Sequence, residues 1–399
     1  MKNYLTLVLA LTVVSAPAFA SRARLEALGD SENGSYYIDD ARNIFLNPAQ
    51  IVHYKKKLFL ETGNDPGVTN FAGSATPDLA VTANRAEGGF TNTFGDFTYG
   101  VYFDHQSQKT LQNIAVANAA TSKTFIAPDK NIEVFFAGEG SLNWGISAWW
   151  AGNDSTNATT YGDGNERTAK QIGVRLGIET GALQVFGTVG LVGTSYILDA
   201  LQSEVKAKVG VDAGVTYKVN EATYFGKFLT VGSDIDNLSA AGSTDAQIRD
   251  TAYGIGAGWK HEMTKATNMF ARLEADYEKA GVSGANVNTW NIPASVGAEA
   301  QALSWLTVRG SVQESVIGEQ TGTNGRNSLA GTTTVSLGLG LTFGDVQIDG
   351  LVATGNSPVN PTNSNTGGNL AGFGTAPQSG SNWGLGDNML SRISLTYNF

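Results

Sequence analysis

The stretch EVKAKVGVDAGVTYK (Glu204–Lys218) alternates apolar residues with polar or small ones along its whole length. Successive side chains of a β-strand point to opposite faces, so a period of two predicts a strand whose faces meet two different environments. A helix would repeat its apolar residues every three to four positions instead. One face carries Val205, Ala207, Val209, Val211, Ala213, Val215 and Tyr217, and the other carries Lys206, Lys208, Gly210, Asp212, Gly214, Thr216 and Lys218.

The same alternation recurs from Leu58 to the last residue. It is clear in DFTYGVYFDH (Asp96–His105), MFARLEADYE (Met269–Glu278) and RISLTYNF (Arg392–Phe399). Many of these strands reach about ten residues or more, which exceeds the usual length in soluble sheets and suits a tilted membrane crossing. We expect about sixteen strands, centred near Leu60, Phe90, Val101, Phe135, Ile146, Val174, Val189, Val211, Phe228, Ile255, Leu273, Val296, Val308, Leu337, Ile348 and Leu395.

The connections between these strands alternate between short and long. The short ones are Phe94–Asp96, Gly138–Ser141, Thr180–Ala182, Val219–Glu221, Glu262–Ala266, Gln301–Leu303 and Phe343–Asp345. The long, polar ones include Asn64–Asn84, Gln106–Lys130, Gly152–Glu166, Asp234–Gln247 and Gly355–Asp387. Short periplasmic turns and long extracellular loops are typical of bacterial outer-membrane barrels. The sequence therefore predicts an all-β fold, a transmembrane antiparallel up-and-down β-barrel, in preference to a soluble β-sandwich.

Composition supports this class. The chain has 49 glycines, 9 prolines and no cysteine, and only 16% of its residues are charged. The mean hydropathy of −0.12 fits strands that are half apolar and half polar. The formal net charge of −10 and the lack of basic clusters argue against nucleic-acid binding. Without cysteine, the chain cannot be a disulfide scaffold.

The first twenty residues, MKNYLTLVLALTVVSAPAFA, have the three parts of a secretory signal peptide. Lys2 supplies the charge, a short apolar run follows, and an A-x-A site ends at Ala20. We expect cleavage between Ala20 and Ser21. Residues 21–57 lack alternation and form either a periplasmic tail or a segment inserted in the lumen, and residues 58–399 form the barrel.

Charged residues on the polar faces must line the lumen, because an Arg or Lys facing lipid at mid-bilayer costs about 2–4 kcal/mol. Their signs nearly balance, so we expect weak ion selectivity. The expected pore-lining residues are Asp104, Glu133, Arg175, Glu179, Lys206, Lys208, Asp212, Lys218, Arg272, Glu274, Asp276, Glu299, Arg309, Asp349 and Arg392. Aromatic residues near strand ends would form the interfacial girdles: Trp144, Trp149, Trp150, Tyr217, Trp259, Trp290, Trp305 and Tyr397.

No enzyme chemistry, metal site or cofactor site is expected. The three histidines, His53, His105 and His261, lack ligand spacing. His105 near Ser107 is a weaker candidate for a nucleophilic site than for an ordinary loop. The acidic loop Gly152–Glu166 departs from an EF-hand pattern and is better explained as a solvated loop. The loop Gln106–Lys130 is the candidate to fold inward and narrow the pore.

The segment NIFLNPAQI (Asn43–Ile51) resembles the N-terminal plug of the long-chain fatty-acid transporter family. That family has fourteen strands rather than sixteen, and no apolar lumen suited to an acyl chain is evident here. The whole chain resembles the porin-like major outer-membrane protein of bdellovibrio-type predatory bacteria. That resemblance implies an abundant general-diffusion porin in the outer membrane of a Gram-negative cell. Sixteen-stranded general porins are commonly trimers, so a homotrimer is expected on the same basis.

Three functions follow as hypotheses. The first is a porin for passive diffusion of small hydrophilic solutes, since a sixteen-stranded barrel can hold a water-filled channel. The second is a plugged barrel that transports hydrophobic substrates, and the third is a structural or adhesive surface barrel. The expected partners are outer-membrane lipid and the barrel-assembly machinery, for which Phe399 would be the terminal recognition signal.

Overall fold

The computed structural model describes residues 21–31, 33–64, 84–105, 117, 125–128, 130–155, 165–198, 202–236, 246–283, 285–322, 325–358 and 392–399. The predicted signal peptide and most of the five long loops lie outside the described residues. None of the helices in the described part is long and apolar enough to span a bilayer.

The described residues form eighteen strand segments in one antiparallel sheet. They are β1 (Lys57–Asn64), β2 (Asn84–Phe94), β3 (Phe97–Phe103), β4 (Lys130–Gly138), β5 (Asn143–Ser155), β6 (Glu166–Thr180), β7 (Leu183–Leu198), β8 (Ser203–Ala207), β9 (Gly210–Val219), β10 (Ala222–Asp236), β11 (Ala246–Thr264), β12 (Thr267–Val282), β13 (Ala285–Leu303), β14 (Leu306–Gly322), β15 (Gly325–Ser328), β16 (Thr332–Phe343), β17 (Val346–Pro358) and β18 (Arg392–Asn398). Both β8 and β9 lie between β7 and β10, and both β15 and β16 lie beside β14. Each of these pairs forms one interrupted strand, so sixteen strands surround the barrel and the predicted fold is confirmed.

The barrel closes between its first and last strands. β1 pairs with β18 from Lys57 opposite Asn398 to Gly63 opposite Arg392, and β1 also pairs with β2. The last backbone N–H, that of Phe399, donates to the carbonyl of Lys56 at 3.1 Å. In the described part of the chain the sheet therefore continues around the whole barrel, which is the condition for crossing a bilayer with strands.

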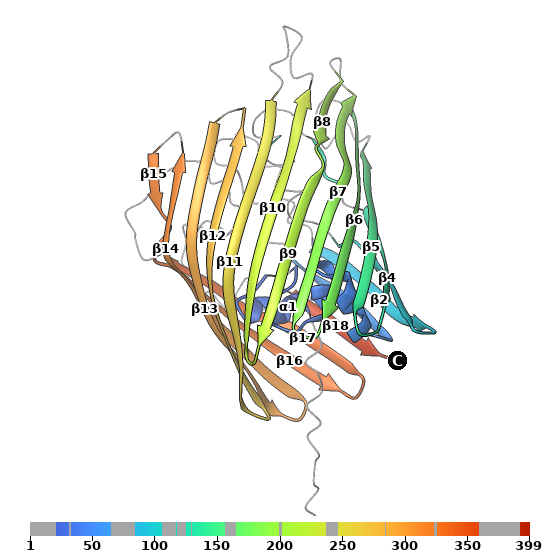
Figure 1. Ribbon diagram of the computed structural model, residues 1–399, viewed down its shortest axis with the longest axis vertical. Coiled ribbons are helices and arrows are strands. Elements are labelled where there is room, and N and C mark those ends of the chain that lie inside the picture. Colours follow the sequence, from blue (N-terminus) through green and yellow to red (C-terminus); the bar gives the residue numbers. More distant parts are fainter. Residues whose placement is uncertain are drawn as a thin grey trace, which may run out of the picture.

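The short turns lie together at one end of the barrel, the lower end in Figure 1. Gly95, Gly181 and Gly344 occupy three of them with φ values of +59°, +51° and +59°, a region that glycine enters without strain. Tight two-residue hairpins require such values. This end is periplasmic by the rule for outer-membrane barrels, and the long connections are extracellular.

The outer face is apolar and the inner face is polar. Leu60, Ile146, Val296 and Leu395 point outward, and all but Leu395 are about half exposed. Seven of the eight predicted girdle aromatics are exposed on this face. Trp149 is the exception and corrects the prediction: it is 6% exposed and lies inside the barrel, because its register position faces inward and Gly173 leaves room for its ring.

One β-bulge reverses the alternation within the stretch Glu204–Lys218, and a second bulge lies beside it in β7. Opposite β10, Ala207 faces Ser233 whereas Val211 faces Thr230, so one extra residue is inserted between them. β7 carries a matching extra residue, Leu191, relative to β6. A bulge of one residue turns all side chains beyond it to the other face.

The bulge makes the prediction for Lys206 and Lys208 wrong. Val205 is buried inside the barrel, and Lys206 lies on the outer face opposite Asp234. Lys208 lies in the bulge and pairs with Asp234 on the same outer face, at 2.8 Å.

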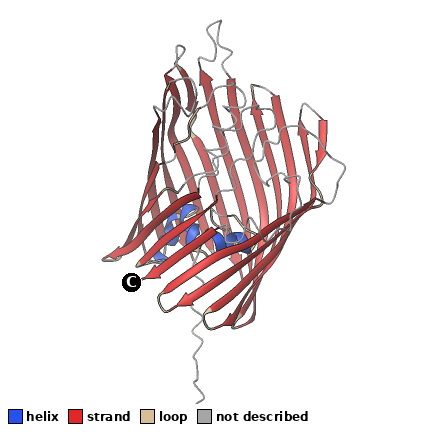
Figure 2. Cartoon of the chain, turned by 180° about the vertical axis from the view of Figure 1, so that it is seen from behind, coloured by secondary structure: helices blue, strands red, loops and turns tan. Residues whose placement is uncertain are grey.

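A short segment fills part of the lumen near the periplasmic end. It contains α1 (Arg22–Ala27) and two 3-10 turns, η1 (Ala41–Phe45) and η2 (Pro48–His53). Figure 2 shows these helices enclosed by the strands in the lower half of the barrel. Of the two positions left open for residues 21–57, the structure has the one inside the barrel. We call residues 21–54 the plug.

The reversed alternation can be tested with single cysteines, because the chain has none of its own. We expect Lys206→Cys in intact cells to react with a water-soluble maleimide, because this position is exposed on the extracellular end of the outer face. Val205→Cys should be protected, since Val205 is 3% exposed. Faster labelling at position 205 than at 206 would contradict the bulge.

Candidate functional site: the lumen and its plug

Local capping sets the shape of the plug. The Ser21 hydroxyl accepts the Arg24 N–H at 3.0 Å, the Asp40 carboxylate accepts the Arg42 N–H at 3.0 Å, and the Asn47 side chain accepts the Ala49 N–H at 3.0 Å. Each of these contacts satisfies a backbone donor at a helix start. Pro48 fits the first position of its turn because its N–H would be unpaired there. The plug is therefore a chain of three short, capped helical elements.

Apolar contacts join the plug to the wall. Ile44, Phe45 and Ile51 pack with Phe59 of β1 and Phe135 of β4. Leu25, Leu28 and Ile38 pack with Phe270 of β12, and Ala23 and Ala27 pack with Leu351 of β17. Burying such side chains stabilises the docked plug by about 1.5–3 kcal/mol for each large residue.

Inward-facing glycines make room for the plug backbone. The Asn47-Pro48-Ala49 turn rests on Gly145 of β5 and Gly177 of β6, which are register partners. A Cβ on Gly145 would overlap the backbone of Pro48 and Ala49. The resemblance of this turn to a plug therefore agrees with a physical fit between turn and wall.

Buried ion pairs join the plug to several strands. Arg42, with a side chain 3% exposed, contacts Glu61 of β1 at 2.5 Å and also Glu87 of β2. Removing one partner of such a buried set typically costs about 3–5 kcal/mol, because the remaining charge is left uncompensated. Arg42 thus anchors the plug at β1, one of the two strands that close the barrel, and at its neighbour β2.

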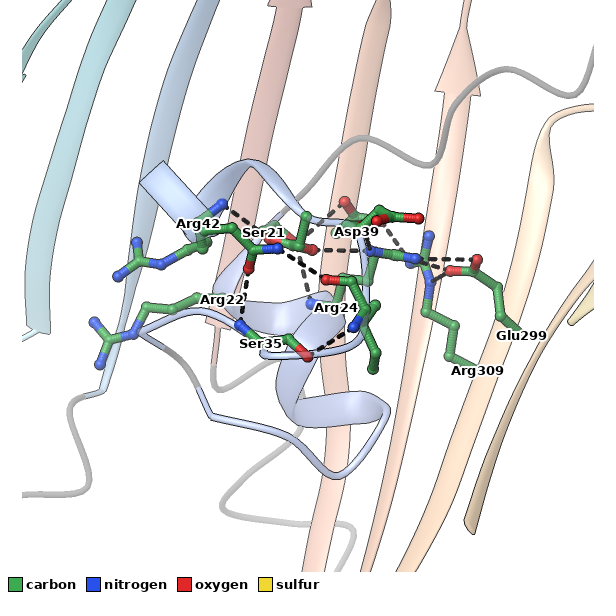
Figure 3. A network of polar contacts seen from close by, with 12 residues as sticks. Ser21, Arg22, Arg24, Ser35, Asp39, Arg42, Glu299 and Arg309 are labelled. Carbon is green, nitrogen blue, oxygen red and sulfur yellow. Dashed lines mark hydrogen bonds and ion pairs between the residues drawn. The ribbon is translucent and has the colours of Figure 1, made fainter. Parts of the chain in front are cut away.

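Arg24 anchors the opposite side of the plug (Figure 3). It contacts Asp40 within the plug and Glu299 of β13, both at 2.9 Å. Glu299 in turn contacts Arg309 of β14, and Arg309 contacts Asp349 of β17, both at 2.5 Å. The Ser21 hydroxyl donates to Asp349 at 3.1 Å and completes a chain of polar contacts that returns to the plug.

The remaining anchors are spread around the circle. Arg272 of β12 contacts Asp30 at 2.7 Å, and Arg392 of β18 contacts Glu26. Glu179 of β6 contacts His53 at 2.7 Å and accepts from Gln50 at 3.0 Å.

Twelve of the predicted pore-lining residues lie on the inner face. They are Glu133, Arg175, Glu179, Asp212, Lys218, Arg272, Glu274, Asp276, Glu299, Arg309, Asp349 and Arg392. Five of them, Glu179, Arg272, Glu299, Asp349 and Arg392, directly contact the plug rather than an open channel. Two other groups of inner-face charges pair with one another: Arg175 with Glu133, and Lys227 with Glu274 and with Asp276 at 3.0 Å.

Asp104 differs from its prediction. It adopts a left-handed φ of +62° just after β3 and is exposed. This turn directs His105 into the lumen instead, where its ring stacks on Phe45 of the plug with centroids 3.5 Å apart. Ser107, its sequence neighbour, lies outside the described residues.

Sequence reasoning missed Glu61, Glu87 and Lys227 on the wall, and Arg24 and Arg42 in the plug. Glu61 lies in KLFLETGN (Lys57–Asn64) and Glu87 in NRAEGGFTNTF (Asn84–Phe94), where a period of two could have found them. Lys227 shares its face with the apolar Phe225 and Leu229, so the period alone does not mark it. Nothing local marks the two arginines, because their partners are far along the chain.

Part of the predicted inward loop does lie in the lumen. Phe125 is 1% exposed and packs with Ile197, Val205, Ile235 and Ile248 of the inner wall, and the Ser195 hydroxyl donates to the Ile126 carbonyl at 2.7 Å. Residues 125–126, just before β4, therefore lie against the inner wall in the extracellular half of the lumen. Its other residues, except Ala117, Ala127, Pro128 and Lys130, are outside the described part.

His53 is a titratable group at the periplasmic mouth of the barrel. Its hydrogen bond to Glu179 raises the pKa of His53 above the ordinary value. In the described residues, no group of three or more acidic or histidine side chains could hold a metal ion.

Comparison with known proteins adds no family. No protein-family profile matches the chain, and no curated protein matches it. Solved structures with a similar fold include a loop L8 deletion mutant of OmpT, an outer membrane protein of Vibrio cholerae (12% identity, 71% of this chain and 95% of that one, TM-score 0.37). They also include the FrpB iron transporter from Neisseria meningitidis (11% identity, 78% of this chain and 56% of that one, TM-score 0.39). A third is a bacterial polysaccharide outer membrane secretin (7% identity, 87% of this chain and 99% of that one, TM-score 0.37). Values this low carry no argument about function, and the fold rests on the strand pairing itself.

The chain is an outer-membrane β-barrel. Its closed sheet, its apolar outer face and its division into short turns and long loops meet the physical requirements of a multi-pass barrel.

The close contact between Gly145 and the plug can be tested by adding a single methyl group at this position. We expect Gly145→Ala to displace the Asn47-Pro48-Ala49 turn and to weaken plug docking by about 1–3 kcal/mol, as overpacking does. Weaker docking should appear as faster cleavage by trypsin after Arg42 and Lys55. The folded barrel should keep its electrophoretic mobility in unheated gels. Gly190→Ala is the control, since a Cβ there finds its nearest atom at 3.9 Å. Equal protease sensitivity in both variants would refute the fit.

The His53 contact predicts a pH dependence. Because its folded pKa is raised, the stabilising charge is fully present below the ordinary value near 6.5 and is lost as pH rises through the raised value. As pH rises from acidic to mildly alkaline, hydrogen exchange of the Tyr54 amide should therefore become faster. The increase should exceed the intrinsic rise of the amide exchange rate with pH. His53→Gln keeps a hydrogen-bonding group without the charge and should remove the extra dependence.

Proposed function

We propose that this protein is a channel for small hydrophilic solutes, narrowed at its periplasmic end by the plug. The single observation behind the proposal is the division of charge between the two faces. Ionised groups such as Lys227, Asp276 and Arg175 lie on the inner face, and large apolar side chains cover the outer face. Charges at this depth need water or partners, and a sixteen-stranded barrel is wide enough to contain water.

The plug is the element that would set the permeability. Its apolar and ionic contacts join it to β1, β2, β4, β6, β12, β13, β17 and β18, so it occupies a large part of the periplasmic cross-section. Such a channel would conduct less than an unplugged barrel of the same strand number. Mixed signs on the wall favour weak ion selectivity.

A second candidate is transport of hydrophobic substrates through the plugged barrel. It is favoured by the docked Asn-Pro-Ala turn and by the inner apolar cluster of Ile197, Val205, Ile235 and Ile248. Phe125 already covers that cluster, and most of the inner wall is polar, so we prefer the hydrophilic channel.

Planar-bilayer recording of the full chain tests the proposal. We expect the wild-type protein to pass a steady current in salt, and Gly145→Ala to pass a several-fold larger one because its plug docks less firmly. Gly190→Ala should match the wild type. The absence of current from all three proteins would overturn the channel, and saturable binding of a labelled fatty acid without ion current would instead favour the second candidate.

A further inference from the structure

The outer face of the barrel carries a row of lysines near its extracellular end. Lys130 of β4 lies opposite Gly152 of β5, which lies opposite Lys170 of β6. The row continues through Thr194 of β7 to Lys206 of β8. Directly opposed residues on antiparallel strands point to the same face, so all three lysines project outward.

This row lies at the upper boundary of the apolar belt. Two residues closer to the membrane centre on the same strands are Ile132, Trp150, Ile172 and Val192, which are register partners and between 41% and 50% exposed. Two residues span about 7 Å along a strand. The ammonium groups are therefore at the level where hydrocarbon gives way to lipid headgroups.

Trp150 occupies the space between Lys130 and Lys170. A Cβ on Gly152 would lie 2.8 and 2.9 Å from the Cζ2 and Cη2 atoms of the Trp150 ring, so the indole covers the glycine that separates the two lysines. Two strand spacings of about 4.8 Å place the lysine Cα atoms about 10 Å apart. Their long flexible stems allow both ammonium groups to reach one anion above the indole.

The lysines of the row differ in their charge partners. Lys206 is neutralised by Glu204 at 3.1 Å and Asp236 at 3.0 Å. Among the described residues, neither Lys130 nor Lys170 has a carboxylate partner, and both are exposed. Asp154, the nearest outward carboxylate by register, lies one row further from the membrane and pairs with neither of them in this part of the chain.

We propose that Lys130, Lys170 and Trp150 form a binding site for the phosphate of an anionic lipid in the outer leaflet. The two lysines, which have no carboxylate partner among the described residues, would bind the phosphate. The indole would lie at the headgroup level, and Ile132 and Ile172 below would contact the acyl chains. A basic side chain near an anionic lipid surface contributes a modest favourable energy, and interfacial tryptophan is a common membrane anchor. The site is on the outer wall, so it does not depend on what passes through the lumen.

Lipid retention by the purified full chain tests this site. The protein is incubated with mixed micelles of phosphatidylglycerol and phosphatidylcholine near physiological salt, and the retained lipids are counted by native mass spectrometry. We expect the wild type to retain phosphatidylglycerol preferentially, by roughly five- to thirty-fold for two lysines. Lys130→Gln with Lys170→Gln should abolish most of this preference, and Trp150→Leu should reduce it.

The matched control removes the same number of charges from the same face. Lys206→Gln with Lys208→Gln should keep most of the preference, because those lysines are already paired and salt screens their distant effect. If both double variants lost the lipid preference equally, the preference would come from overall charge rather than from a specific site, and the proposal would be overturned. So would a wild type without lipid preference, or competition by inorganic phosphate as strong as that of the lipid. If the double glutamine variant does not fold, Lys130→Gln alone must still lower the preference.

Discussion

The pairing of β1 with β18 is the constraint on which the rest of this protein depends. A sheet with an open edge would leave backbone N–H and C=O groups unpaired in hydrocarbon, where each costs several kcal/mol. Closure removes that cost and at the same time creates an inside. Once an inside exists, charges such as Glu61 and Arg309 have a place away from lipid, and a segment without alternation can be enclosed.

The wall and the plug are complementary at the level of single atoms. Glycines face inward where the plug backbone comes near, as at Gly145, and carboxylates face inward where the plug carries arginine, as at Glu299. Glycine positions in a barrel wall would otherwise be explained by strand curvature or close packing alone. Here the two kinds of residue together describe the surface against which the plug docks.

Much of the architecture could be predicted from the sequence, because period-two alternation and loop length are local signals. Strand number, closure by Arg392–Phe399 and the inner position of Arg272 or Glu299 follow from them. The side of Lys206 could not, because a one-residue bulge at Lys208–Gly210 leaves the apparent alternation unbroken while it reverses the faces. The partners of Arg24 and Arg42 were also out of reach, since such contacts join residues up to hundreds of positions apart.

The distribution of the plug contacts has a mechanical consequence. Ionic or polar side-chain contacts connect the plug to strands on several sides of the barrel: β1, β2, β6, β12, β13, β17 and β18. A wide cylinder with only water inside resists flattening through its rim alone. With cross-braces at one end, lateral pressure from the surrounding bilayer is shared across the diameter, and that end keeps a round outline.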